Sequence, residues 1–252
     1  MRLADYIEDT MLINVYNDCE SIHPDLNAIE NQLTDALRHY KYYFPATGTF
    51  TVFSYISGFD YEHPVQLIDN NFLISIDMYL GADYSRYKYL GVPLYVLNKF
   101  DEDFVTRDCM YALGNRHIDF RAKGNSLLDN IILNGKLLWF VNAMIPDISK
   151  SILLNYTDEQ LKWVQDNEPN IWAFLIENQL LYTTELLPYQ KFILDAPFTS
   201  YFGNDSSPRL GWWIGFRIVD SYMNNNQNIS LGELMLNNDA QSVLNDSGFK
   251  PQ

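Results

Sequence analysis

The four histidines are the residues best suited to bind a metal ion, and their spacing decides whether they could bind one together. A helical zinc site of the commonest kind needs two histidines four residues apart, with a glutamate directly after the first. Here no two histidines lie within ten residues of each other, and none is followed by Glu; they are His23, His39, His63 and His117. The sequence therefore predicts no metal site.

Other catalytic patterns are also missing from the sequence. No Gly-x-Ser-x-Gly segment presents an activated serine, and Gly135-Lys136 lacks the upstream glycine and the following Ser or Thr of a phosphate-binding loop. Cys19 and Cys109 are ninety positions apart, so we expect two buried thiols, with one disulfide as the alternative. We predict no catalytic residue and no cofactor.

Paired carboxylates are harder to exclude, because the chain has 32 acidic residues and some pair will always be close. Asp77 is the most promising of them, since it lies at the end of an apolar run that is typical of a buried strand. Its carboxylate could cap the following turn or belong to a hydrolytic site. The sequence leaves both interpretations open.

Composition indicates a folded protein and excludes some partners. The chain of 252 residues is 47% apolar and 15% aromatic, with a formal charge of −15. An acidic surface repels phosphates, so we expect neither nucleic acid nor an anionic membrane surface as a partner. No apolar run is long enough for a transmembrane helix, and residues 1–10 do not resemble a signal peptide. Eighteen tyrosines permit a glycan- or peptide-binding surface.

The N-terminal part of the sequence alternates between helical and strand patterns. Helical spacing predicts helices over 24–43 and 104–117, while β-branched and aromatic residues predict strands over 49–56 and 72–78. Residues 79–95 are rich in tyrosine and read as irregular. With helices predominating after residue 100, we predict an α+β fold in a single domain over residues 1–252.

The segment 126–145 contains two conflicting signals. Asn134-Gly135 between apolar runs is typical of a hairpin turn, whereas Ser126 with Asp129 forms a capping pair for one long helix ended by Pro146. We favour the helix. Capping pairs and helical spacing predict further helices in the C-terminal part; these begin after Thr157, near Glu168, after Pro188, after Ser230 and at Asn238.

The segment 207–222 predicts a helix with two interior glycines. Ser207 and Pro208 fit an N-cap and a first helical position. Gly211, Gly215 and Tyr222 then share one helical face. Each interior glycine costs roughly 1 kcal/mol relative to alanine, so something must approach this backbone closely. Tight helix packing is the favoured interpretation, and the wall of a pocket is the alternative.

Several stretches resemble the gliding-motility lipoprotein family GldB of Bacteroidetes. They keep their order across nearly the whole chain; they are residues 73–81, 87–100, 127–147, 156–181, 211–219 and 248–251. The resemblance implies a cell-envelope protein on the periplasmic side, attached by a lipid anchor upstream of this chain and working with a protein or peptide partner. Gliding motility or the associated secretion machinery is the process it implies.

The same pattern is distantly similar to predicted zinc-dependent proteases of zincin-like fold. In those, a helix with His-Glu-x-x-His precedes a helix with Glu-Gly. By order along the chain, residues 104–117 take the place of the first helix and Asn134-Gly135 the place of Glu-Gly, with every metal ligand absent. The resemblance implies a pseudoenzyme whose former active-site groove could bind a ligand. Its lining would be Asp77, Tyr79, Asn134, Lys136 and Tyr222.

The sequence thus favours a non-catalytic envelope protein with a degenerate zincin-like core. Two alternatives stay open: a hydrolase of the peptidase or carboxylate-pair type, and a glycan- or peptide-binding module that uses exposed aromatic side chains.

Overall fold

The computed structural model describes residues 8–120 and 124–251, which divide into two compact units, Met1–Leu113 and Gly114–Gln252. The fold is α+β, as predicted. All the described strands lie in the first unit, and the described part of the second unit is helical. The single domain predicted over residues 1–252 stays a prediction.

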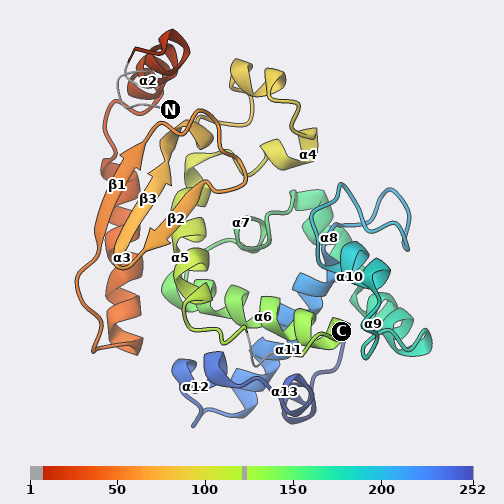
Figure 1. The fold of residues 1–252 in the computed structure, drawn as a ribbon. Coiled ribbons are helices and arrows are strands. Elements are labelled where there is room, and N and C mark those ends of the chain that lie inside the picture. Colours follow the sequence, from red (N-terminus) through yellow and green to blue (C-terminus); the bar gives the residue numbers. More distant parts are fainter. Residues whose placement is uncertain (1–7, 121–123, 252) are drawn as a thin grey trace. The chain divides into compact units, whose positions relative to one another are not determined.

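The first unit contains a three-stranded sheet with the order β1-β3-β2 (Figure 1). Strand β1 (Thr51–Tyr55) is parallel to β3 (Asn71–Ser75), and β2 (Val65–Ile68) is antiparallel to β3. The two predicted strands are confirmed, but β2 was not predicted. The second predicted strand ends at Ser75, after which the chain makes the 3-10 turn η1 (Ile76–Met78).

Helix α3 of the first unit confirms the helical spacing seen in the sequence. Its buried residues recur on one face at Ile29, Leu33, Ala36 and Tyr40. Helix α2 was not predicted, although Asp9 caps it with its side chain. The helices and turns of this unit, beside η1, are α2 (Thr10–Ile22), α3 (Asn27–Tyr43), η2 (Ser85–Tyr89), α4 (Leu94–Leu97), η3 (Glu102–Phe104) and α5 (Val105–Asn115).

The second unit is built around α6 (Leu127–Met144), which is one continuous helix. The hairpin alternative is therefore wrong: Asn134-Gly135 lies inside the helix, and the reciprocal capping box of Ser126 with Asp129 opens it. The other helices are α7 (Lys150–Leu154), α8 (Asp158–Asp166), α9 (Glu168–Glu177), α10 (Leu186–Phe192), α11 (Leu210–Asn225), α12 (Leu231–Leu236) and α13 (Ala240–Ser247). No helix in the described ranges has the length and hydropathy needed to cross a membrane.

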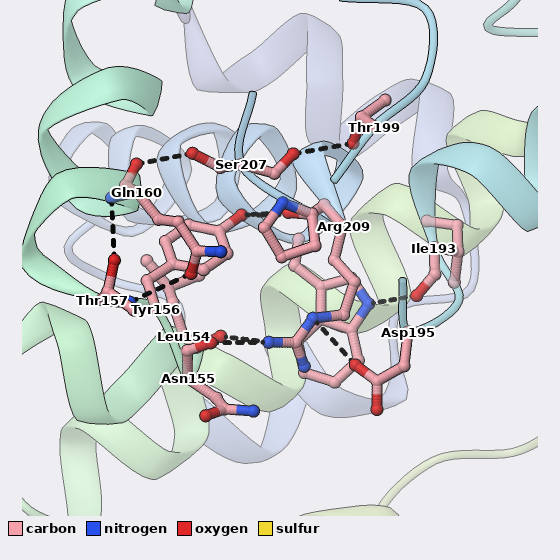
Figure 2. Close-up of polar contacts among 12 residues, drawn as sticks. Leu154, Asn155, Tyr156, Thr157, Gln160, Ile193, Asp195, Thr199, Ser207 and Arg209 are labelled. Carbon is pink, nitrogen blue, oxygen red and sulfur yellow. Dashed lines mark hydrogen bonds and ion pairs between the residues drawn. The ribbon is translucent and has the colours of Figure 1, made fainter. Parts of the chain in front are cut away.

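Several of the expected helix starts need correction. Helix α3 begins at Asn27 rather than at residue 24, and α13 begins at Ala240 rather than at Asn238. Helix α10 begins at Leu186, two residues before Pro188. Helix α11 is not capped by Ser207, and Pro208 is not its first residue; instead Arg209, in the left-handed conformation with φ 48°, precedes the helix. Ser207 thus lies two residues before the cap, and its hydroxyl donates to the backbone carbonyl of Gln160 (Figure 2).

Glycines allow α6 and α11 to pack backbone against backbone. A Cβ atom on Gly215 would lie 2.0 Å from the carbonyl oxygen of Ile131, and one on Gly135 would lie 2.2 Å from the carbonyl oxygen of Gly215. Real Cβ atoms essentially never approach so closely, so only glycine fits at these positions. This confirms tight helix packing as the reason for the interior glycines.

Candidate functional site

Asp77, the acidic residue singled out in the sequence, is fully buried and holds a turn in place. Its carboxylate accepts hydrogen bonds from the backbone N–H groups of Ser57 (2.9 Å) and Phe59 (2.8 Å). The hydroxyl of Ser57 also donates to it and accepts in turn from the N–H of Asp60. Asp77 therefore acts as a capping carboxylate, but for the turn that follows β1 rather than for the turn after itself.

Tyr79 is also buried, and it links the end of the sheet to α5. Its hydroxyl donates to Asp108 Oδ2 at 2.9 Å, while Arg107 donates to Asp108 Oδ1 at 2.8 Å. Burial, and then the negative charge of Asp108, raise the pKa of Tyr79 well above its ordinary value. The phenol is thus a neutral donor in a structural network.

The other three predicted site residues belong to the second unit and are buried. Lys136 donates to the carbonyl oxygens of Met235 (3.0 Å) and Asn237 (2.8 Å) at the end of α12. Burial lowers the pKa of Lys136 to about 8. The amide of Asn134 donates to the carbonyl of Asn130 one turn earlier, and Tyr222 is buried on α11.

The five predicted site residues are divided between the two compact units. Asp77 and Tyr79 lie in the first unit, and Asn134, Lys136 and Tyr222 lie in the second. A single ligand groove lined by all five stays a prediction.

A cluster of polar contacts in the second unit surrounds the start of α11 (Figure 2). The buried guanidinium of Arg209 donates to the carbonyl oxygens of Leu154 (2.6 Å) and Asn155 (3.0 Å), and its Nε lies 3.2 Å from Asp195 Oδ1. It also stacks on the ring of Trp212, 4.7 Å from the centroid. The hydroxyl of Tyr156 donates to the carbonyl of Pro208. The cluster joins α7, α8 and α11, so its role is structural.

Within residues 8–120 and 124–251, no three His, Cys, Asp or Glu side chains are grouped so that they could hold a metal ion. Both cysteines are free and buried, which confirms the prediction of two thiols.

Two clefts of about 340 Å³ and about 480 Å³ lie in the first unit, between β1 and the helices α2 and α3. Both are lined by Leu26, Ser54 and Ile76, so the two clefts adjoin each other, and together we call them the β1 groove. The α2 end of the groove is lined in addition by Leu12, Ile13, Tyr16, Cys19, Glu20, His23, Tyr55 and Ile56. The α3 end is lined in addition by Ile29, Glu30, Leu33, Thr34, Leu37, Phe50, Thr51, Val52 and Ile74.

The β1 groove presents apolar side chains to solvent. Ile13 is 46% exposed, Tyr16 is 52% exposed and Val52 is 44% exposed. Exposed apolar side chains that lie together are typical of a surface that packs against a partner. Glu20 and Glu30 are the acidic lining residues, and no Lys or Arg lines the groove in the described part of the chain.

The polar side chains of the groove wall are not arranged for catalysis. Burial raises the pKa of Cys19 to about 12, so its thiol stays protonated and poorly nucleophilic. His23 is held at both ring nitrogens: Nε2 lies 2.9 Å from the carbonyl oxygen of Tyr79, and Nδ1 lies 3.3 Å from a carboxylate oxygen of Glu102. Neither Cys19 nor His23 is therefore placed as a reactive group in the groove.

Strand β1, which forms one wall of the groove, is an edge strand. It pairs with β3 on one side, and no strand pairs with its other side among the residues that the structure describes. No charged residue occurs from Tyr42 to Phe59, so the edge lacks the charges that usually prevent unwanted pairing. By contrast, β2 at the opposite edge is preceded by Pro64 and followed by Asp69.

Sequence reasoning placed the candidate site elsewhere and missed the β1 groove. The signal that could have indicated it is the uncharged, aromatic and β-branched run over residues 49–56, which by itself predicts only a strand. Whether that strand would lie at an edge depends on sheet order, which the sequence does not contain.

In a comparison with protein families, a family model described as "Gliding motility protein GldB" matches residues 1–251. Neither the curated proteins nor the solved structures contain a significant match to the chain.

Proposed function

Because the chain belongs to the family of the gliding motility protein GldB, we propose that it is a non-catalytic cell-envelope protein that works by binding a protein or peptide partner. In this proposal it acts on the periplasmic side, held by a lipid anchor upstream of this chain. It serves gliding motility or the secretion machinery associated with it.

The observation that carries the proposal is the β1 groove. It combines an exposed apolar lining with a strand edge that no described strand pairs with, and both features favour aggregation in a protein that binds nothing there. Ile13, Tyr16 and Val52 are its most exposed apolar residues. A groove of this kind also fits the peptide-binding alternative, which the proposal therefore includes.

A degenerate zincin-like core is the second part of the proposal. Support comes from the roles of the side chains at the positions where a protease would have its ligands. In residues 104–117, which take the place of the ligand-bearing helix, Asp108 is engaged by Tyr79 and Arg107 and Met110 is fully buried. Asn134, in the place of the glutamate, bonds within its own helix. These groups stabilise the fold, and their oxygen, amide and thioether atoms do not form the donor set that zinc prefers.

Zinc binding and proteolysis test the non-catalytic part. We expect no stoichiometric zinc uptake in calorimetry, and no release of fluorescence from labelled casein with or without zinc. Stoichiometric zinc together with casein cleavage would contradict the proposal and favour the hydrolase alternative.

Genetic complementation tests the role of the groove. The protein would be displayed in the envelope of a gliding bacterium that lacks its own family member. We expect Val52→Glu and Tyr16→Glu to abolish colony spreading, because each places a charge on the apolar lining. Tyr89→Glu is the matched control, since Tyr89 is 88% exposed and does not line the groove. Spreading by all three variants at equal protein levels would show that the groove is not used.

A further inference from the structure

The backbone of β1 offers hydrogen-bonding groups that face away from the sheet. The N–H of Thr51 donates to the carbonyl of Asn70, and Thr51 is in register with Asn71 of the parallel strand β3. In a parallel ladder the residues of one strand alternate between the two sides. Thr51, Phe53 and Tyr55 therefore pair with β3, whereas the N–H and C=O groups of Val52 and Ser54 point to the opposite side, where no strand of the described residues pairs with β1.

The same two residues are among those that line the groove. Val52 lines its α3 end, and Ser54 lines both ends. A chain added beside Val52 and Ser54 would thus bond to their backbone and could place alternate side chains in the hollow between β1 and the helices α2 and α3. This is the arrangement of strand addition, in which backbone bonds supply affinity and pockets select side chains.

Charge indicates the nature of the added chain. The first unit contains seventeen acidic and seven basic residues, a net charge of −10. Glu20 and Glu30 line the groove, and neither forms an ion pair with a described residue. Two copies of this unit would repel each other, whereas lysine or arginine beside an apolar segment would be attracted.

We propose that the β1 groove binds an extended segment of another protein, which adds a strand to the edge of β1, places apolar side chains in the groove and has Lys or Arg near its ends. The proposal rests on the binding role proposed above and specifies the partner's chemistry. Five residues of β1 give a contact about 17 Å long, enough for a short segment.

A synthetic peptide tests the proposal on the intact chain. The probe is Lys-Lys-Val-Thr-Val-Thr-Val-Lys-Lys, measured by fluorescence anisotropy beside a version with Glu at both ends and a version with N-methylated valines. We expect saturable binding of the Lys peptide, at least about tenfold tighter than that of the Glu peptide, and loss of binding on N-methylation.

Substitutions at Ser54 separate backbone pairing from other contacts. Ser54→Pro removes an N–H that β3 does not use, so the sheet should tolerate it, as edge strands do. We expect it to weaken peptide binding about tenfold or more, because a donor is lost and the ring blocks the edge. Ser54→Ala, which keeps the N–H, should stay within about twofold. Circular dichroism and the urea midpoint would verify that both variants are folded.

The acidic residues provide a second pair of variants. Glu20→Gln and Glu30→Gln should each weaken binding of the Lys peptide about threefold in low salt, whereas Glu62→Gln should not. Glu62 is exposed in the same unit and does not line the groove. Because Glu62→Gln also removes one negative charge, its net charge equals that of the two groove variants.

Amide exchange gives a readout that is specific to strand addition. The N–H of Phe53 is already bonded in the ladder, so only the amides of Val52 and Ser54 should gain protection when the peptide binds.

Absence of saturable binding, or self-association through β1, would overturn the proposal. Equal binding by Ser54→Pro and Ser54→Ala would refute strand addition but leave groove binding intact, whereas zinc-dependent casein cleavage would refute the proposed function itself.

Discussion

Replacing Gly215 with alanine tests the account of the second unit most severely. The new Cβ would lie 2.0 Å from the carbonyl oxygen of Ile131, and contacts under 3.0 Å are essentially never seen. The backbones of α6 and α11 would have to separate by about 1 Å, which is the difference between these two distances. Overpacking of this kind costs roughly 3 kcal/mol, and alanine returns about 1 kcal/mol through helix propensity. We therefore expect a net loss of about 2 kcal/mol in the free energy of unfolding.

Urea denaturation followed by circular dichroism measures this loss. Asn224→Ala is the control, because it lies exposed on the same helix and should change stability by no more than about 0.5 kcal/mol. Gly135→Ala should resemble Gly215→Ala, and the double variant should cost less than the sum, since one separation of the helices relieves both clashes. A Gly215→Ala protein as stable as the natural one would refute the backbone packing described above.

Three further predictions concern buried polar groups. Burial lowers the pKa of Lys136 to about 8, below its unfolded value, so the unfolded chain binds more protons between these values. In urea titrations, the free energy of unfolding of the natural protein minus that of Lys136→Met should therefore increase from pH 7.5 to pH 9.5. A decrease would contradict the lowered pKa of Lys136. Arg209→Ala should be about 1 kcal/mol less stable than Arg209→Gly in thermal melts, because φ is 48° there; equal stability would remove the strain argument. Asp77→Ala should lower the free energy of unfolding in urea by about 3 kcal/mol, since the buried N–H of Phe59 and the partly buried N–H of Ser57 lose their acceptor, and a change below about 0.5 kcal/mol would show that the turn does not need it.

Local signals in the sequence predicted most helices of the second unit. Capping residues such as Ser126, Thr157 and Ser230 form reciprocal bonds within three residues, so they act before any tertiary contact. The same local logic failed at Ser207, whose hydroxyl bonds to Gln160, 47 positions away in the chain. A tertiary partner of this kind cannot be inferred from spacing.

The candidate site was harder to predict than the fold. Asp77 and Lys136 attract attention in the sequence because charged groups amid apolar residues are unusual, yet their hydrogen bonds show that they stabilise turns and helix ends. The β1 groove depends on which strand lies at the edge of the sheet. That order is set by pairing of β1 with β3 across about twenty residues, which periodicity does not encode.

Photo-crosslinking in living cells tests the central claim, that a partner occupies the β1 groove, most directly. A photoreactive phenylalanine analogue would replace Tyr16, which lines the groove, or Tyr89, which is exposed outside it. The account predicts a protein adduct of one defined mass at position 16 that is lost when Ser54→Pro is added, and none at position 89. No adduct at position 16, or the same adducts at both positions, would contradict it.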